Sequence, residues 1–406
     1  MVLLLNVPLY GTKQAANCFY TSLRKSASKR NYKRSRADPC LYYIWTDGRL
    51  ALFATWVDDI IVFGHPQDVD TIEKNLKEAF VCKSEGELKE YVGSKIDVMR
   101  KSNGLATVKI TQPVLIQKLE DEFDVSTGKA PGTPARPGEV LSKLHGGELL
   151  TSAAATNYRS GTATLMFIMQ WSRPDIFNAT RGCARHMSAP GTVHNDALYW
   201  LIHYVISTRN RGLVLEPDRV WDGSSKFKFR IGGRADSNYA ANEDDRRSVS
   251  GGRVRLEGCP VTFRSATQRF VTLSVTEAEG AAGNMVAQDM MYLYQSLTKI
   301  GLSVELPMVL EMDNSGAVDL ANSYSVGGRT RHVDVRLYYL RELKEEGLLV
   351  IKHIPGENND ADIFTKNTDA RTFERHIPSF VGKDEYMVKG EEDVKKPRRV
   401  RFANGS

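Results

Sequence analysis

The sequence has no long hydrophobic run, and its cysteines are few and scattered. No stretch of about 18 apolar residues occurs, which argues against a membrane-spanning helix. The five cysteines form no Cys-X-X-Cys pair, and their odd number argues against a disulfide framework or a zinc site. Residues 1–9 are apolar but lack the basic start and the cleavage site of a secretion signal. We therefore expect reduced thiols in an intracellular protein. We also expect residues 1–9 to be a strand cut off from a longer protein.

Charge of one sign is not strongly in excess. The chain has 55 Lys and Arg against 49 Asp and Glu, which gives a net charge of +6. This balance is compatible with binding a polyanion but does not by itself indicate one. The 406 residues, 41% hydrophobic and 26% charged, have the composition of a globular protein of two or three domains.

Two apolar runs near the N-terminus, residues 50–56 and 60–63, flank Val57, Asp58 and Asp59. Runs of this length predict the two strands of a β-hairpin with carboxylates at its tip. Paired aspartates can bind the Mg²⁺ ions that carry nucleotide phosphates. The tripeptide alone also fits an ordinary turn.

Changes of pattern divide the rest of the chain. Residues 129–138 are rich in Pro and Gly, which predicts a linker. Residues 157–211 have apolar faces at helical spacing. Residues 226–366 follow the order strand, strand, strand, helix, strand, helix, helix, strand, helix. The charged sequence after residue 383 predicts disorder.

Four acidic residues of this C-terminal part occur at the ends of predicted elements. Asp236 and Asp313 end strands, Glu279 lies in the first turns of the long helix, and Asp362 opens the last helix. In a mixed sheet covered by helices, such points can gather at one edge. Four close carboxylates repel one another unless cations hold them, and Mg²⁺ prefers oxygen ligands. Each acid taken singly also fits a surface or helix-capping role.

Several motifs occur in a fixed order along the chain. The C-terminal ones are Asp236-Ser-Asn-Tyr-Ala, Val275-Thr-Glu-Ala-Glu279, Met312-Asp313-Asn314 and Asn359-Asp-Ala-Asp362-Ile-Phe-Thr-Lys366. The N-terminal ones are Leu9-Tyr-Gly-Thr-Lys13-Gln14-Ala15, Trp56-Val-Asp58-Asp59 and Ser172-Arg173-Pro-Asp175-Ile176. Through these motifs the chain resembles the C-terminal part of the Pol polyprotein of copia-type retrotransposons.

The resemblance implies a multidomain α+β or α/β fold. Residues 1–128 would form a truncated reverse-transcriptase palm and thumb, and residues 129–225 a linker with a helical connection. Residues 226–370 would form an RNase H-like mixed sheet with flanking helices. Residues 371–406 would form a C-terminal tail that is disordered at its end.

The implied activity is metal-dependent cleavage of RNA in RNA–DNA hybrids. Asp236, Glu279, Asp313 and Asp362 would be the catalytic ligands of Mg²⁺ or Mn²⁺, with two ions per active site. Glu277 is the alternative to Glu279. For His332 an auxiliary role near the metals and a structural role both stay open, whereas His353 is expected to be structural. An inactive nucleic-acid-binding remnant of a retroelement is the alternative function.

The resemblance also implies an incomplete polymerase site. Asp58 and Asp59 match the metal-binding palm hairpin of RNA-directed DNA polymerases, with Trp56 in place of the usual Tyr. A third carboxylate and the fingers are expected before the first residue. We therefore expect polymerase activity to be lost or to need that N-terminal region. Two further departures, Gly280 for a usual Tyr and Phe263 for a common Trp, remove no ligand.

The implied partners are an RNA–DNA hybrid and a template–primer. Other parts of the Pol polyprotein are further expected partners, including integrase and the N-terminal reverse-transcriptase region, and a membrane is not expected. The expected location is the cytoplasm, inside a virus-like particle, and the basic stretch 395–401 leaves the nucleus open. The residues expected to contact nucleic acid are Lys13, Gln14, Arg264, Arg329 and Arg331.

Overall fold

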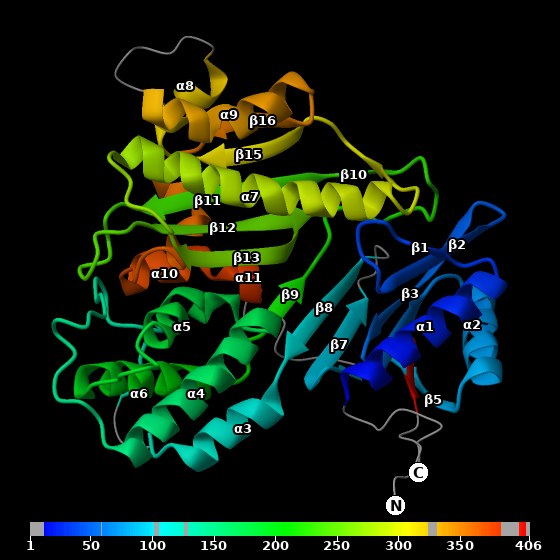
Figure 1. Ribbon diagram of the computed structural model, residues 1–406, viewed down its shortest axis with the longest axis horizontal. Helices are drawn as coiled ribbons and strands as arrows, with labels where there is room; N and C mark the ends of the chain where they lie inside the picture. Colours follow the sequence, from blue (N-terminus) through cyan, green and yellow to red (C-terminus); the bar gives the residue numbers. More distant parts are fainter. Residues whose placement is uncertain are drawn as a thin grey trace, which may run out of the picture.

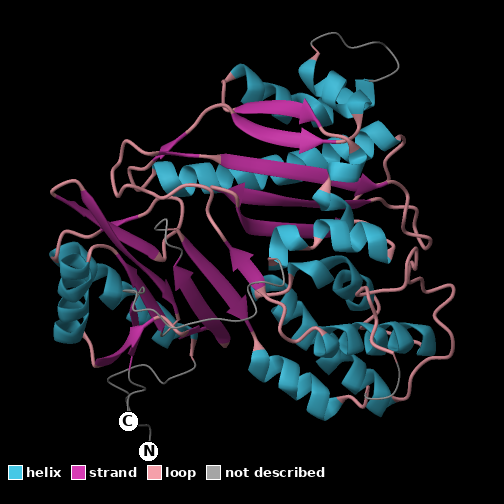
Figure 2. Ribbon diagram, turned by 180° about the vertical axis from the view of Figure 1, so that it is seen from behind, coloured by secondary structure: helices cyan, strands magenta, loops and turns pink. Residues whose placement is uncertain are grey.

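A computed structural model of the chain describes residues 12–57, 59–100, 105–125, 129–323, 331–382 and 398–402 (Figure 1). In these residues helices pack against four sheets of six, five, four and two strands. The predicted mixed α and β architecture is therefore confirmed. Seen from behind, the five-stranded sheet lies above a layer of helices, with the six-stranded sheet to one side (Figure 2).

The six-stranded sheet contains the predicted hairpin. Strands β3 and β4 pair antiparallel from Leu52 and Phe63 to Trp56 and Asp59, so this prediction is confirmed. Val57 at the tip has a φ of 54°, a left-handed backbone that β-branched residues rarely adopt. The strand order is β1-β2-β3-β4-β17-β5. Its elements are α1 (Lys13–Lys29), β1 (Lys33–Arg34), β2 (Leu41–Thr46), β3 (Arg49–Trp56), β4 (Asp59–Phe63), α2 (Pro66–Ala79), β5 (Cys82–Glu87) and β17 (Arg398–Phe402).

The middle of the chain forms a four-stranded sheet, in the order β6-β7-β8-β9, and the predicted helical region. Its motif Ser172-Arg173-Pro-Asp175-Ile176 is structural: Arg173 and Asp175 are fully buried and their side chains pair at 2.7 Å. Tyr204 also donates a hydrogen bond to Asp175. The elements are β6 (Glu90–Tyr91), β7 (Ser94–Arg100), β8 (Ala106–Thr111), α3 (Pro113–Glu122), α4 (Ser152–Trp171), η1 (Pro174–Ile176), α5 (Phe177–Ala184), α6 (Thr192–Ser207) and β9 (Leu213–Leu215).

The five-stranded sheet has the order β13-β12-β11-β15-β16. Strands β11, β12 and β13 pair antiparallel, whereas β15 runs parallel to β11 and β16 parallel to β15. The predicted order holds for the five strands of this sheet and for α7, α8 and α9, whereas the structure adds the two-residue strands β10 and β14 and has a 3-10 helix at Asp360–Phe364. The elements are β10 (Lys228–Phe229), β11 (Ile231–Asn238), β12 (Val249–Leu256), β13 (Cys259–Thr267), α7 (Val275–Thr298), β14 (Ser303–Val304), β15 (Met308–Met312), α8 (Ser315–Asn322), α9 (Arg331–Glu345), β16 (Leu349–His353), η2 (Gly356–Asn358), η3 (Asp360–Phe364), α10 (Ala370–His376) and α11 (Pro378–Val381).

Helix α7 crosses β11 and β12 at close range (Figure 1). Two sheet glycines make this approach possible. A Cβ atom on Gly252 would lie 2.3 Å from Val286, and one on Gly233 would lie 2.5 Å from the Met290 sulfur. The core beneath α7 therefore depends on backbone atoms of the sheet meeting helix side chains directly. This packing fixes the height of α7, and of Glu279, above the sheet.

The opposite side of the five-stranded sheet shares its core with the helical region. Phe263 of β13 lies 6.0 Å, between ring centroids, from Phe364 of η3 and 6.3 Å from Phe177 of α5. Phe380 of α11 completes this aromatic cluster. Residues 371–381, predicted as the start of the tail, instead belong to helices α10 and α11, whose Phe373 and Phe380 are buried.

The prediction of disorder after residue 383 is wrong for Arg398–Phe402. These residues form β17, which pairs antiparallel with both β4 and β5. The physical reason is that two strands flank one open position in the sheet, and a strand placed there satisfies the backbone groups of both.

Two stacked histidines make the helical region sensitive to acid. The His186 ring is buried and stacks on His194 at 3.9 Å between ring centroids. Burial, reinforced by His194, lowers the pKa of His186 to about 4.

We therefore expect stability to fall as the pH drops below the unfolded-state value of about 6.5 towards 4, by at most about 1.4 kcal/mol per pH unit. Between these two pH values, His186 binds a proton in the unfolded chain but not in the folded one. Urea unfolding at pH 7 and pH 5 should show a smaller acid loss in His186→Phe than in the wild type, whereas the exposed control His65→Gln should behave as wild type. An unchanged acid loss in His186→Phe would contradict this assignment.

Candidate metal centre

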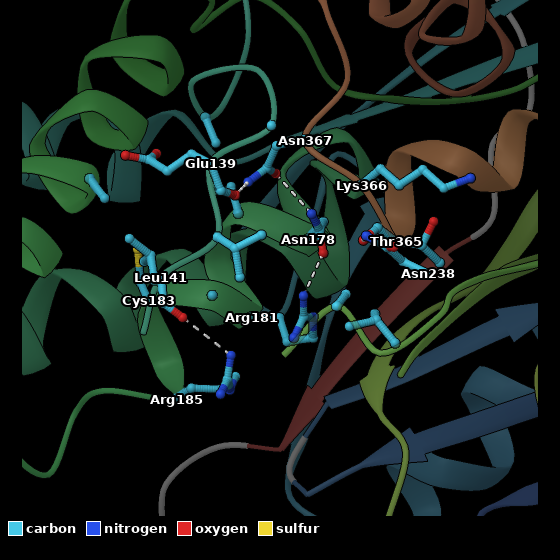
Figure 3. Close-up of a pocket in the computed structure, with 18 of the residues that line it drawn as sticks. Glu139, Leu141, Asn178, Arg181, Cys183, Arg185, Asn238, Thr365, Lys366 and Asn367 are labelled. Atoms are coloured by element: carbon cyan, nitrogen blue, oxygen red, sulfur yellow. Dashed lines mark hydrogen bonds between the residues drawn. The ribbon is translucent and has the colours of Figure 1, made fainter. Parts of the chain in front are cut away.

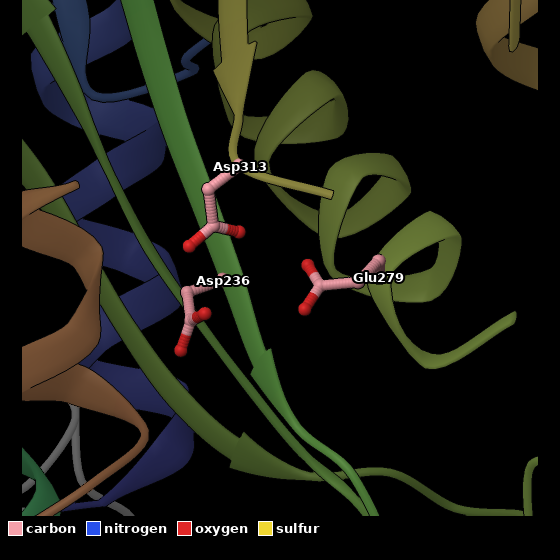
Figure 4. A group of neighbouring side chains, drawn as sticks. All are labelled: Asp236, Glu279 and Asp313. Carbon is pink, nitrogen blue, oxygen red and sulfur yellow. The ribbon is translucent and has the colours of Figure 1, made fainter. Parts of the chain in front are cut away.

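Three of the four predicted acidic residues converge at one edge of the five-stranded sheet (Figure 4). Asp236 lies near the end of β11, Asp313 directly follows β15, and Glu279 reaches over from the first turns of α7. One carboxylate oxygen from each lies within 4.8 Å of the others. Strands β11 and β15 are parallel neighbours, so they end at the same edge and present their two aspartates side by side. The arrangement offers oxygen ligands to a hard cation.

Burial and mutual repulsion make two of these carboxyl groups, those of Asp236 and Glu279, hard to ionise. Burial, with opposition from Lys366 and reinforcement from Asp362 and Asp313, raises the pKa of Asp236 to about 7. Burial and then the two aspartates raise the pKa of Glu279 to about 9. A divalent cation would reverse this balance because it favours the ionised forms.

Glu279, not its alternative Glu277, is the glutamate that joins the two aspartates. Glu277 is also buried, but it serves the start of α7. Its carboxylate accepts a hydrogen bond from the Leu273 backbone at 2.6 Å, while its own N–H donates to the Ser274 hydroxyl. In contrast, Oε2 of Glu279 is buried and has no hydrogen-bond partner among the described residues. Such an atom is costly unless a ligand satisfies it.

Asp362 lies outside this group of three and is paired with a cation of the chain itself. Lys366 Nζ lies 2.8 Å from Asp362 and 3.3 Å from Asp236, so the ammonium bridges the two acids. Burial alone would lower the pKa of Lys366, but Asp236 and Asp362 together raise it. Thr365 also donates a hydrogen bond to Asp236. Neither Lys366 nor Thr365 was singled out from the sequence, although the Asp362–Lys366 spacing of four residues signals a pair.

A buried ion-pair network holds the segment that carries Asp362 and Lys366. Asp360 is 1% exposed and accepts hydrogen bonds from Arg253 and Arg255 of β12 at 3.1 Å. Arg234 of β11 approaches the same carboxylate at 3.3 Å. Beside it, the Asn359 side chain donates to the Ala235 backbone carbonyl, next to Asp236. The network therefore positions η3 against the strand that presents Asp236.

The segment after Lys366 is tied to the helical region beside a cavity of about 250 Å³ (Figure 3). Asn367 donates to the Glu139 carbonyl at 2.7 Å and accepts from Asn178 of α5 at 2.8 Å. Arg181 donates in turn to Asn178 at 2.7 Å. These hydrogen bonds fix the segment of Lys366 relative to two other parts of the sequence, the loop of Glu139 and helix α5.

Of the two aspartates of the predicted palm hairpin, the structure describes Asp59 alone. Asp58 lies outside the described residues. Asp59 is buried at the start of β4. Among the described residues, it belongs to no cluster of acidic side chains that lie close enough together to hold a metal ion. Trp56 is 52% exposed and its ring lies 5.9 Å from that of Trp171, so the hairpin tip rests beside α4.

The residues predicted to contact nucleic acid are only partly described. Gln14 is exposed on α1. Arg264 is 53% exposed and pairs with Asp289 at 2.7 Å. His353, predicted to be structural, hydrogen-bonds through Nε2 with the Asp313 carbonyl, next to the acidic group. Arg329 and the side chains of Lys13, Arg331 and His332 lie outside the described part of the chain.

One departure from the resembled motif has a steric explanation. A Cβ atom on Gly280 would lie 2.7 Å from Leu337 of α9. Helices α7 and α9 therefore meet too closely here for a larger side chain. The close contact places Leu337 next to the turn of α7 that carries Glu279.

Comparison with known proteins finds similar sequences along most of the chain. Residues 1–137 match the family described as reverse transcriptase (RNA-dependent DNA polymerase). The chain is 28% identical over 379 residues to the retrovirus-related Pol polyprotein from transposon TNT 1-94 of Nicotiana tabacum, which covers 92% of this chain and 28% of that protein. It is 28% identical over 367 residues to that from transposon RE1 of Arabidopsis thaliana, covering 90% and 24%. The chain is thus similar to copia-type retrotransposon Pol polyproteins over about nine tenths of its own length.

The chain spans about a quarter of the length of these curated relatives. Among solved structures, RNase H1 in complex with an RNA/DNA hybrid is similar with a TM-score of 0.27 and 19% identity, covering 34% of this chain and 94% of that one. In the described residues, no helix combines the length and apolar character needed to cross a bilayer.

Proposed function

We propose that this chain cleaves the RNA strand of RNA–DNA hybrids in a reaction that depends on divalent cations. The convergence of Asp236, Glu279 and Asp313 is the observation that carries the proposal. Similarity to retrovirus-related Pol polyproteins supports it, because reverse transcription generates such hybrids. Water is the nucleophile, and the products are RNA fragments.

The side chains fit Mg²⁺ or Mn²⁺. The donors are all carboxylates, and Glu279 Oε2 is a buried acceptor with no partner among the described residues. Asp236, Glu279 and Asp313 would hold the first ion, and we propose Asp362 as a further ligand of a two-ion site. Bound ions would lower the pKa of a coordinated water and offset charge at the phosphate. Lys366, already between Asp236 and Asp362, would offset the remaining negative charge.

The proposed partners are an RNA–DNA hybrid and other parts of the Pol polyprotein, in an intracellular particle. Phosphate contacts by Lys and Arg would make binding largely independent of sequence and sensitive to salt.

The test is cleavage of a hybrid labelled on its RNA strand by the purified chain. We expect RNA fragments with Mg²⁺ or Mn²⁺, none with EDTA, and no cleavage of duplex DNA of the same sequence. A thermal shift with Mg²⁺ in the absence of substrate measures ion binding separately. Hybrid binding without cleavage at any cation concentration would favour the inactive remnant instead.

We also expect the 406-residue chain to extend no primer. Two-metal transfer needs ligands that hold both ions in line with the attacking and leaving oxygens. Near Asp59 the described residues offer no such group. A labelled template–primer with all four nucleotides, assayed in the preparation that cleaves hybrid, checks this. Extension by this preparation would show that the hairpin is a working polymerase site.

A further inference from the structure

Strand β17 occupies an unusual place in the six-stranded sheet. It comes from the C-terminal end of the chain, yet it lies between β4 and β5 of the N-terminal region, antiparallel to both. Within the described residues β4 and β5 do not pair with each other. Both therefore depend on one distant segment for the backbone hydrogen bonds of their facing edges.

The position that β17 fills is suited to an extended segment with one apolar side. Ile60 and Val62 of β4 are fully buried. Val400 stands opposite Ile60 on one side and Ser84 of β5 on the other. The sequence Arg399-Val400-Arg401-Phe402 alternates basic and apolar residues, which is the pattern of a half-buried strand.

Several of the facing positions in this backbone register carry charged residue types. Arg401 stands opposite Asp59, and Arg398 stands opposite Glu87. Opposite charges in directly facing positions stabilise an antiparallel pair, and like charges destabilise it. One like-charged pair, Arg401 with Lys83, opposes this preference.

An empty position here would expose two strand edges at once. Unpaired edges accept extended segments from other chains, because backbone hydrogen bonds supply the affinity and side-chain alternation supplies the selectivity. Since β4 begins at Asp59, any occupant also borders the predicted palm hairpin.

We propose that the position between β4 and β5 is a strand-acceptor site for an extended segment of alternating basic and apolar residues. The chain's own residues 398–402 occupy it, and the same segment binds there in trans once the covalently attached copy is removed. This proposal does not depend on nuclease activity.

The first experiment traps the register in the intact chain. Phe402 and Cys82 face each other, at a separation typical of antiparallel pairs that a disulfide can bridge. In Phe402→Cys, mild oxidation should give a disulfide between residues 82 and 402 as the main product by mass spectrometry, in a monomer on a non-reducing gel. The matched variant Arg401→Cys, opposite Lys83, should not link to Cys82. Equal linking by both variants, or a linked dimer, would overturn occupation by the chain's own strand.

The second experiment tests binding in trans. A chain ending at residue 397 should bind a fluorescent peptide of residues 396–406 saturably by anisotropy. The full chain should bind it at least about tenfold more weakly, since its site is already filled. A peptide with Val400→Pro should not bind, because proline removes a backbone donor from the ladder. Equal affinity of the two chains, or no peptide binding by a truncated chain whose β11 and β15 amides keep their full-length protection from hydrogen exchange, would refute the acceptor site.

Truncation could also unfold the sheet, so hydrogen exchange in full-length Val400→Pro provides an independent measurement. Amides of residues 60–62 and 83–87 should lose protection, whereas those of β11 and β15 should keep it. Unchanged protection in β4 and β5 would overturn the proposal.

Discussion

Replacing Glu279 with Gln should reduce hybrid cleavage by about three orders of magnitude, equivalent to about 4 kcal/mol of transition-state stabilisation. Gln keeps the size of the side chain but cannot supply the negative oxygen that a divalent cation requires. Cleavage rates at saturating Mg²⁺, together with the Mg²⁺-induced thermal shift, measure the effect. We expect both the rate and the shift to be lost.

Stability without cations separates this role from a structural one. The wild-type chain buries Glu279 beside two aspartates, which raises its pKa to about 9. Removing one of three mutually repelling groups should leave the free energy of unfolding in EDTA unchanged or higher. A stability loss in EDTA that accounts for the lost activity would contradict the metal-ligand role.

Glu277→Gln is the matched control, two residues away on the same helix. Glu277 accepts the Leu273 N–H, and an amide oxygen can still do so. We expect at most about 1 kcal/mol of destabilisation and a cleavage rate within about threefold of wild type. If Glu277→Gln abolished cleavage and Glu279→Gln did not, the assignment of the two glutamates would be reversed.

The sequence contained the signals for much of this site. The segment Ser274-Val-Thr-Glu277 has the serine and glutamate spacing of a capping box, which predicts that Glu277 serves the helix start and leaves Glu279 for chemistry. The hairpin that carries Asp59 was predictable because its strands are adjacent and strongly apolar. Local pattern was sufficient wherever the partner strand lies close in the chain.

Long-range pairing was not predictable in the same way. Residues 398–402 have three arginines and were interpreted as a charged tail, although Val400 and Phe402 alternate with them. Their strand identity depends on an open position between β4 and β5, far away in the sequence. Likewise, Asp362 was expected to join the acidic group. The turn of η3 instead brings Lys366 next to Asp362, and the sequence does not show in advance which charged group will lie nearest.

Asp360→Asn should lower the free energy of unfolding by about 3–5 kcal/mol, the usual cost of breaking a buried ion pair by removing one partner. Asp360 is the carboxylate shared by Arg253, Arg255 and Arg234. Arg234 also pairs with Glu311 at 2.7 Å, so Asp360 is the acid on which Arg253 and Arg255 depend. Burial together with repulsion from Arg255 and Arg234 lowers the pKa of Arg253 to about 10, although Asp360 opposes this. Without Asp360, a buried cation would remain unpaired at neutral pH.

The pKa shift of Asp360 determines how its contribution to the free energy of unfolding depends on pH. Burial alone would raise the pKa of Asp360, but Arg253, Arg234 and Arg255 together hold it below its usual range. A carboxyl group whose pKa is lower in the folded state stabilises the protein at pH values above its unfolded-state pKa. This stabilisation is lost as the pH falls through its folded-state pKa. The stability difference between wild type and Asp360→Asn should therefore be constant at neutral pH and narrow only below about pH 4.

Asp289→Asn provides the comparison, because it breaks the pair with Arg264, whose side chain is 53% exposed. Solvent screens such a pair, so this variant should lose at most about 1 kcal/mol in urea unfolding at pH 7. Asp360→Asn should also cleave hybrid more slowly, since η3 carries Asp362 and precedes Lys366. A loss no larger than that of Asp289→Asn would mean that water satisfies the three arginines. The network would then not be what holds η3 against the strand of Asp236.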